Sequence, residues 1–294
     1  MDKLIITVAV TGSLPTKLVT PHVPITPEEI VRDGIACEAA GASVIHLHAR
    51  DPQDESPATD FALFESMCHG IQTKTRLITQ ISTGGRAGMA YEQRCERLKL
   101  KPEMASLTTG SVNFPNSVYQ NSPGLIDALA ADMQRYGIKP EMEIFDVSMI
   151  SNATALLAKG LVAAPLHFDF VMGLKGAIPA SVENLVHMRN TIPADATWTV
   201  AGIGRAQLVM TTHAILMGGH VRVGLEDNIY YRRGELATNA QLVERVVRLA
   251  GELGREVATP EEVDATLRRF ASLGLEIELT GLRLELGQRV EMPV

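Results

Sequence analysis

The stretch Ile45-His46-Leu47-His48-Ala49-Arg50-Asp51 carries the side chains best suited to hold a metal ion. It follows a short β-branched run, and alternate side chains of a strand point to the same face. His46 and His48 therefore project together. Neutral imidazoles are good zinc ligands, and a catalytic zinc site combines three protein ligands with one open position. The spacing predicts a catalytic metal site that lacks one ligand.

The missing ligand is expected from Gly224-Leu225-Glu226-Asp227-Asn228, which ends a later strand-like run. By spacing alone, either Glu226 or Asp227 could bind metal, and the other carboxylate would then be available as a base. Arg222 shares a strand face with Glu226, and a buried arginine needs a carboxylate partner, for which Asp227 and Glu143 are the candidates. Three other histidines are weaker candidates for the third ligand: His22, His167 and His213.

Two segments rich in small residues are suited to bind an anion. Ser82, Thr83, Gly84 and Gly85 follow a strand-like run, and small residues let backbone N–H groups converge on a carboxylate or a phosphate. A second segment, which includes Ser106 and Thr108, repeats this composition and is followed by Asn113 as a further amide. We expect both segments to bind substrate.

The composition is that of a folded enzyme rather than a nucleic-acid or membrane protein. The chain has 294 residues, of which 46% are hydrophobic, and a formal net charge of −7 without a basic run. These values allow a large core and argue against nucleic acid as a partner. We find no apolar run long enough to span a membrane and no signal-peptide pattern. The three cysteines are widely spaced, which favours reduced thiols and a cytoplasmic location.

Short β-branched runs alternate with helical patterns along the chain. Strict alternation implies a parallel sheet, and eight strand–helix units in fewer than 300 residues favour a closed (β/α)₈ TIM barrel over an open doubly wound sheet. Active sites of such barrels lie at the carboxyl ends of the strands, where the residues above are placed. The strands are expected at 4–10, 43–48, 77–82, 104–108, 141–145, 165–170, 197–201 and 220–225, and the helices at 27–41, 59–73, 88–99, 122–137, 148–160, 181–190, 205–217 and 239–253.

The whole chain, residues 1–294, is expected to form a single barrel domain. From about residue 260 onward we predict a C-terminal extension of one more helix and a tail. The tail, 276–294, is rich in Leu and Glu, and we expect it to clasp a neighbouring subunit.

From about Ile5 to Leu275 the sequence resembles the β-keto acid cleavage enzyme family, typified by the 3-keto-5-aminohexanoate cleavage enzyme. The resemblance is carried by motifs spread over this whole range: Thr11-Gly12, Pro24-Ile25-Thr26-Pro27-Glu28-Glu29, His46-Leu47-His48-Ala49-Arg50-Asp51, Ser82-Thr83-Gly84-Gly85, the segment 105–114, Glu141-Met142-Glu143, the segment 200–205 and the segment 218–228.

The resemblance implies a zinc-bearing (β/α)₈ barrel that assembles as a homotetramer. It implies a reaction in which a β-keto acid and acetyl-CoA give acetoacetate and a new acyl-CoA. It assigns zinc to His46, His48 and Glu226, with Asp227 as the base. Arg222 and Glu143 would support Asp227.

The resemblance also assigns the substrate carboxylate to Ser82 and to the backbone amides of Thr83, Gly84 and Gly85. Ser106 stands where the family has a threonine. Family members with an amino substrate carry a glutamate near the first strand, and Leu14 stands near that position here.

Two other functions fit parts of the sequence. A zinc-dependent hydrolase of the amidohydrolase type would use metal to activate water, but its His-x-His pair belongs on the first strand rather than the second. A non-enzymatic metal-binding protein would leave Asp227 without a role. We therefore favour the β-keto acid cleavage reaction.

Overall fold

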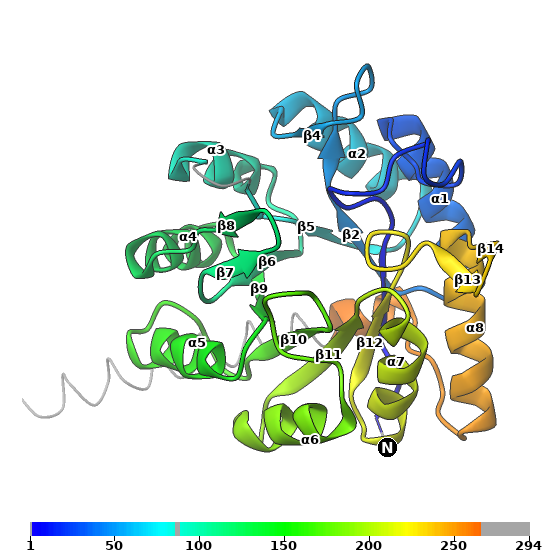
Figure 1. The fold of residues 1–294 in the computed structure, drawn as a ribbon. Helices are drawn as coiled ribbons and strands as arrows, with labels where there is room; N and C mark the ends of the chain where they lie inside the picture. Colours follow the sequence, from blue (N-terminus) through cyan, green and yellow to red (C-terminus); the bar gives the residue numbers. More distant parts are fainter. Residues whose placement is uncertain (1, 86–88, 266–294) are drawn as a thin grey trace, which may run out of the picture.

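A computed structural model describes residues 2–85 and 89–265 of the chain. Eight parallel strands close into a barrel in the order β1-β12-β11-β10-β9-β6-β5-β2, which confirms the predicted TIM barrel (Figure 1). The barrel strands are β1 (Ile6–Ala9), β2 (Val44–Leu47), β5 (Ile78–Ile81), β6 (Met104–Thr108), β9 (Lys139–Ile144), β10 (His167–Met172), β11 (Thr197–Gly202) and β12 (His220–Val223).

Helices surround the barrel and bury one side against the strands (Figure 1). They are α1 (Pro27–Ala40), α2 (Phe61–Lys74), α3 (Tyr91–Cys95), the 3₁₀ helix η1 (Glu96–Leu100), α4 (Pro123–Tyr136), α5 (Ser148–Ala158), α6 (Val182–Thr191), α7 (Ala206–Leu216) and α8 (Asn239–Glu252). Local sequence sets their ends. Thr26 and Glu29 form a capping box at the start of α1, for example, and Gly41 takes a left-handed conformation at its end.

One predicted helix, 88–99, differs from the structure. It is divided into α3 and η1, while residue 88 lies outside the described residues. Arg94 in α3 and Arg97 in η1 are three residues apart, which places them on one side of the helical segment, and both are buried there. A short 3₁₀ turn is common at the end of an α-helix, and a sequence pattern does not distinguish the two helix types over so few residues.

Three hairpins, which the sequence analysis did not predict, follow the carboxyl ends of barrel strands (Figure 1). They are β3 (Ala49–Arg50) with β4 (Pro57–Ala58), β7 (Val112–Phe114) with β8 (Ser117–Tyr119), and β13 (Tyr230–Arg232) with β14 (Glu235–Leu236). Their strands have two or three residues, which is too short for an alternating pattern to be recognised.

The opposite end of the barrel is closed by apolar packing. Val44, Ile78 and Met104 form a buried cluster with Ala258 and Val263 from the segment after α8. A helix begins at residue 260, but the predicted tail lies outside the described residues. Within the described ranges, no helix combines the length and the apolar character needed to cross a lipid bilayer.

The last barrel strand ends at Val223, two residues before the predicted end at Leu225. Gly224 turns the chain there with φ of +139°, a value that L side chains rarely adopt. The amide N–H groups of Asp227 and Asn228 both donate to Gly224 O, at 3.3 and 3.1 Å. Glu226 and Asp227 therefore lie in a tight turn after the strand. Glu226 is beside Arg222 because of this turn, and not because the two residues share a strand face as predicted.

We predict that Gly224→Ala destabilises the protein by at least about 2 kcal/mol, because a strained backbone and a close contact would combine. A Cβ at this position would lie 2.1 Å from the Ala9 carbonyl oxygen on the neighbouring strand. Urea unfolding measures the change. Gly251→Ala in α8 is the matched control: its Cβ would meet no atom within 4 Å, and alanine favours a helix. Equal stability of the two variants would contradict the proposed role of Gly224.

Candidate active site

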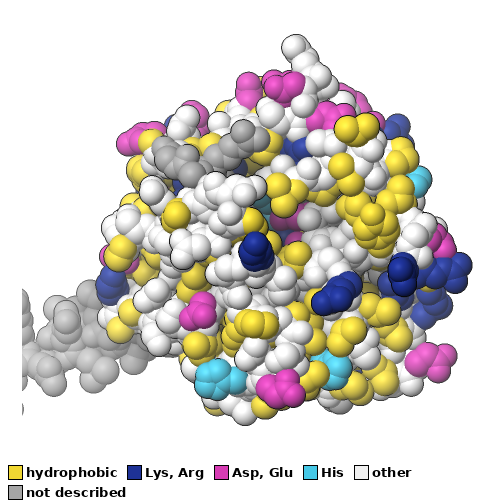
Figure 2. Space-filling model, in the orientation of Figure 1, with side chains coloured by type: hydrophobic (Ala, Val, Ile, Leu, Met, Phe, Trp, Pro, Cys, Tyr) yellow, Lys and Arg dark blue, Asp and Glu magenta, His cyan; other side chains and the backbone are white. Residues whose placement is uncertain are grey.

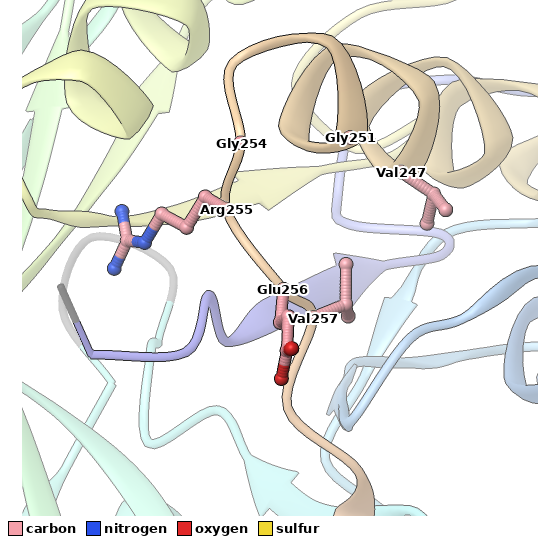
Figure 3. A pocket seen from close by; sticks show the side chains of 6 residues that line it. All are labelled: Val247, Gly251, Gly254, Arg255, Glu256 and Val257. Carbon is pink, nitrogen blue, oxygen red and sulfur yellow. The ribbon is translucent and has the colours of Figure 1, made fainter.

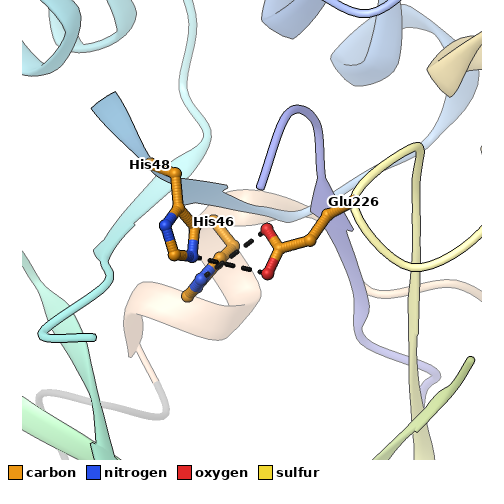
Figure 4. A group of neighbouring side chains, drawn as sticks. All are labelled: His46, His48 and Glu226. Carbon is orange, nitrogen blue, oxygen red and sulfur yellow. Dashed lines mark ion pairs between the residues drawn. The ribbon is translucent and has the colours of Figure 1, made fainter. Parts of the chain in front are cut away.

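His46 on β2 and His48 directly after it point toward Glu226, as Figure 4 shows. His48 Nε2 lies 3.4 Å from Glu226 Oε1, and His46 Nε2 lies 4.0 Å from Glu226 Oε2. One donor atom from each of the three residues lies within 4.8 Å of the others, the only such group of metal-type ligands among the described residues. The structure thus brings together the three residues predicted to bind metal.

The donor atoms of this group fit a cation. His46 Nε2 and Glu226 Oε2 are buried and have no hydrogen-bond partner. His46 Nδ1 lies 2.5 Å from Gln80 Oε1 on β5. The amide oxygen can only accept, so His46 carries its proton on Nδ1 and leaves the Nε2 lone pair free. Burial and the charge of Arg222 lower the pKa of His46 to about 4, which keeps the imidazole neutral.

Gly12 leaves the space that the Glu226 side chain occupies. Its φ is +59°, and a Cβ there would lie 2.4 Å from Glu226 Cγ. The Glu226 amide N–H also donates to Ala9 O at 3.1 Å. The end of β1 therefore fixes both the backbone and the side chain of Glu226 beside the two histidines.

Arg222 on β12 lies among four carboxylates. Its Nε and Nη2 donate to Asp227 at 2.9 and 3.1 Å, and Nη2 donates to Glu226 Oε1 at 2.6 Å. Nη1 lies 3.8 Å from Glu143 and 3.6 Å from Asp169. Both predicted partners, Asp227 and Glu143, are therefore neighbours of Arg222, whereas Asp169 was not among the predicted site residues.

Burial and Arg222 act in opposite directions on these acids. Burial prevails at Asp227, where it raises the pKa to about 6, and it also raises the pKa values of Glu143 and Asp169. At Glu226, burial is outweighed by His48 and Arg222, which hold the pKa well below its usual range. Asp227 is thus a carboxylate that can take up a proton near neutral pH, while Glu226 stays ionised.

The segment from Ser82 to Gly85 lies beside this group. A Cβ at Gly84 would be 3.9 Å from Cε1 of His48. Three of its amides are already hydrogen-bonded: Ser82 N–H donates to Leu47 O at 3.0 Å, Thr83 N–H to Ser106 Oγ at 3.3 Å and Gly84 N–H to Ser82 Oγ at 3.0 Å. Ser106 therefore supports the segment in the structure, and its predicted contact with substrate stays a prediction.

Tyr119 on β8 joins this segment to the acids. Arg94 Nη2 donates to Tyr119 Oη at 3.2 Å, and Thr108 Oγ1 donates to Glu143 Oε2 at 2.5 Å. The two hydroxyls of Tyr119 and Thr108 lie 3.3 Å apart. An arginine can only donate and a carboxylate can only accept. The hydroxyl of Tyr119 therefore donates to Thr108, and the hydroxyl of Thr108 donates to Glu143. Thr108 thus contacts an acid of the site, and its predicted contact with substrate stays a prediction.

The remaining candidate ligands lie elsewhere. His22 is exposed in the loop after β1, and His213 Nδ1 is bonded to Val209 O within α7. His167 lies at the start of β10, where its ring contacts Glu141 and Thr197. None belongs to the group of metal-type ligands found among the described residues.

The barrel face that bears these residues is hollowed. Figure 2 shows acidic side chains in the depth of the hollow, and hydrophobic side chains that gather beside it. The exposed hydrophobic residues of the loop after β1 are Leu14, Leu18 and Val19. A ligand reaching the carboxylates would therefore pass an apolar rim.

Sequence comparison places this chain among enzymes of one kind. Residues 3–268 match the family model described as beta-keto acid cleavage enzyme. The chain is 49% identical, over 90% of its length and 94% of the relative, to 3-oxoadipate:acetyl-CoA acetyltransferase of Cupriavidus necator. It is 47% identical, over 89% of its length and 96% of the relative, to 3-keto-5-aminohexanoate cleavage enzyme of Fusobacterium nucleatum.

Structural comparison shows the shared barrel. The apo structure of ObcA superposes with a TM-score of 0.73 at 21% identity, and the match covers 84% of this chain and 65% of the ObcA chain. The sequence relatives give no support to the alternative of an amidohydrolase-type enzyme.

We predict that Gln80→Leu weakens metal binding about 10–100-fold, because the proton position and orientation of His46 would no longer be held. Titration with a competing chelator measures the affinity. Thr79→Val is the control: Thr79 is equally buried and precedes Gln80 on β5, so its side chain faces the other side of the strand. Equal metal affinity of the Gln80→Leu variant and the parent would contradict this role.

Proposed function

The chain belongs to the β-keto acid cleavage enzyme family, and from this premise we propose that it transfers an acyl group between a β-keto acid and acetyl-CoA. The products would be acetoacetate and a new acyl-CoA. One observation carries the proposal: the mouth of the barrel combines a three-residue metal-type site, His46, His48 and Glu226, with a separate carboxylate, Asp227, suited to move a proton.

The proposed reaction forms one carbon–carbon and one carbon–sulfur bond, and it breaks one bond of each kind. The carbanion of the β-keto acid attacks the thioester carbonyl of acetyl-CoA, and a carbon–carbon bond forms as the CoA thiolate leaves. The thiolate then attacks the ketone that belonged to the original acid. The carbon–carbon bond next to that ketone breaks, which gives the new acyl-CoA and acetoacetate. All atoms of the two substrates are found in the two products, and no redox cofactor is needed.

Asp227 is the proposed base. Its carboxylate takes the proton between ketone and carboxylate and returns it to acetoacetate after cleavage. Arg222, held by four acids, fixes the orientation of Asp227 through two hydrogen bonds. Glu143 lies beside the Nη1 atom of Arg222 and accepts a hydrogen bond from the Thr108 hydroxyl. A divalent ion bound to His46, His48 and Glu226 would polarise the substrate ketone as a Lewis acid.

The segment formed by Ser82, Thr83, Gly84 and Gly85 is proposed to form the binding site of the substrate carboxylate. Because Thr83 and Gly84 donate within the protein, Gly85 N–H and the Ser82 hydroxyl are the groups we assign to direct contact. Ser106 and Thr108 act behind them, through Thr83 and Glu143 respectively.

We further propose that the ion is zinc, that the enzyme is a homotetramer and that it works in the cytoplasm. Two imidazoles and one carboxylate are a frequent catalytic zinc site. The outer face of α7 exposes Leu208, Val209 and Leu216, which is consistent with a subunit contact. The three cysteines are free thiols. Elemental analysis and light scattering test the ion and the assembly.

A substrate panel tests the proposed reaction. The purified protein is incubated with acetyl-CoA and a series of β-keto acids, and acetoacetate and acyl-CoA are measured by mass. Formation of both products in equal amounts supports the proposal. Consumption of a substrate without acetyl-CoA would contradict it and favour a hydrolase.

We predict different losses for the two neighbouring carboxylates at the β12 turn. Asp227→Asn keeps its size and should retain metal, yet lose roughly 10²–10⁴ in kcat because the base is gone. Glu226→Gln should instead lose metal. Exchange of the α-proton with deuterated water, in the absence of acetyl-CoA, isolates the base step. If the Asp227→Asn variant exchanges the proton at the parental rate, Asp227 is not the base, and Glu143 becomes the favoured candidate for that role.

We also predict that neutral or anionic side chains of the β-keto acid are preferred over ammonium-bearing ones. The loop after β1 has no acid between Val10 and Pro27, and Leu14 in this loop is exposed. Lys17 lies in the same loop, 3.0 Å from Glu29. Competition between substrates matched in length measures the preference. Leu14→Glu should shift it toward ammonium-bearing substrates, and a parental preference for an amino substrate would contradict the prediction.

A further inference from the structure

Two arginines lie buried behind the segment from Ser82 to Gly85. Arg94 on α3 is 1% exposed and Arg97 on η1 is 2% exposed. Within residues 2–85 and 89–265, neither forms an ion pair with any carboxylate. A buried charge is normally paired, since removing it from water is costly. These two cations therefore stand out from the other groups of the barrel mouth.

Their hydrogen bonds go to neutral acceptors. Arg94 donates to Thr83 O, Gln120 O, Tyr119 Oη and Asn121 Oδ1, at 2.7 to 3.2 Å. Arg97 donates to Ser82 O at 2.9 Å and Gly84 O at 3.1 Å, and its guanidinium lies 4.8 Å over the Phe64 ring. Burial, and the adjacent charge of Arg94, lower the pKa of Arg97 to about 10, which leaves Arg97 charged at neutral pH.

The arginines hold three successive carbonyls of one segment. Arg97 holds those of Ser82 and Gly84, and Arg94 holds that of Thr83. In a trans peptide, the carbonyl and the following N–H point in opposite directions. The N–H groups of Thr83, Gly84 and Gly85 are therefore directed away from the guanidinium groups. Hydrogen bonding at the carbonyl end also polarises each peptide and strengthens its N–H as a donor.

We propose that Arg94 and Arg97 are positioning residues for the carboxylate subsite, and that their missing counter-ion is the carboxylate of the bound β-keto acid. They act through the peptides of Ser82, Thr83 and Gly84 without touching the substrate. The inference rests on the proposed function, in which this segment binds the carboxylate. It makes the two arginines determinants of specificity for anionic over neutral substrates.

The experiment compares a β-keto acid with its methyl ester. The ratio of their kcat/KM values is measured for the parent, Arg97→Gln and Arg94→Gln. We expect the acid-to-ester ratio to fall about tenfold in each variant, the effect of a unit charge acting over roughly 10 Å at an effective dielectric constant of about 20. A purely structural role would lower both rates and leave the ratio unchanged.

Three variants complete the comparison. Arg97→Lys keeps the charge and should keep most of the parental ratio. Arg97→Met keeps the aliphatic stem over Phe64 and serves as a second neutral variant if Arg97→Gln does not fold. Arg255→Gln is the matched control. Arg255, drawn in Figure 3, follows α8, is buried, and donates to the carbonyls of Asp2, Gly218 and Gly219. Its ratio should equal that of the parent.

The possible failures are distinguishable. A parent protein that turns over no β-keto acid contradicts the proposed function. If the parent prefers the acid, and the folded neutral variants of Arg94 and Arg97 keep its acid-to-ester ratio of kcat/KM, this inference is contradicted and the proposed function is not.

Discussion

The site depends on a single guanidinium group surrounded by acids. Arg222 rises from the barrel interior and contacts Asp227, Glu226, Glu143 and Asp169, which come from three different strands or their ends. Without this cation, the three buried carboxylates and the half-buried Glu226 would repel one another across a space of low dielectric constant. Removing one acid would change the protonation of the others, since all share the same partner. The arrangement therefore behaves as one unit rather than as separate acid and base residues.

The sequence was sufficient for the barrel and for the residues that strand periodicity controls. His46 and His48 alternate on a strand, so their common direction follows from spacing alone. Glu226 was harder, because it lies after a turn that no periodicity describes. A glycine with positive φ makes that turn, and its position became clear in the structure. The resemblance to a family identified Glu226 through its motif, while local reasoning left Asp227 as an equal alternative.

The buried arginines and Tyr119 could not be predicted in the same way. Arg94 and Arg97 belong to a stretch rich in charged residues, which is typical of a solvent-exposed helix face, and nothing local indicates that both turn inward. Tyr119 lies in a hairpin whose strands are too short to carry a pattern. These residues take their roles from contacts outside their own helix or hairpin, and contacts of that kind leave no periodic signal. A buried charge without an acidic neighbour becomes recognisable once coordinates are known.

The contact between Gly12 and Glu226 separates the parts of the mouth that can vary from those that cannot. At Gly12 even one added methyl group would displace a metal-type ligand, so the structure leaves no room for a side chain there. Two residues later, Leu14 is 82% exposed and is free to take other side chains. Side chains in this exposed part of the loop can therefore change while the metal-type ligands stay in place. For protein engineers, the same boundary marks the loop after β1 as the first segment to randomise when a new substrate range is sought.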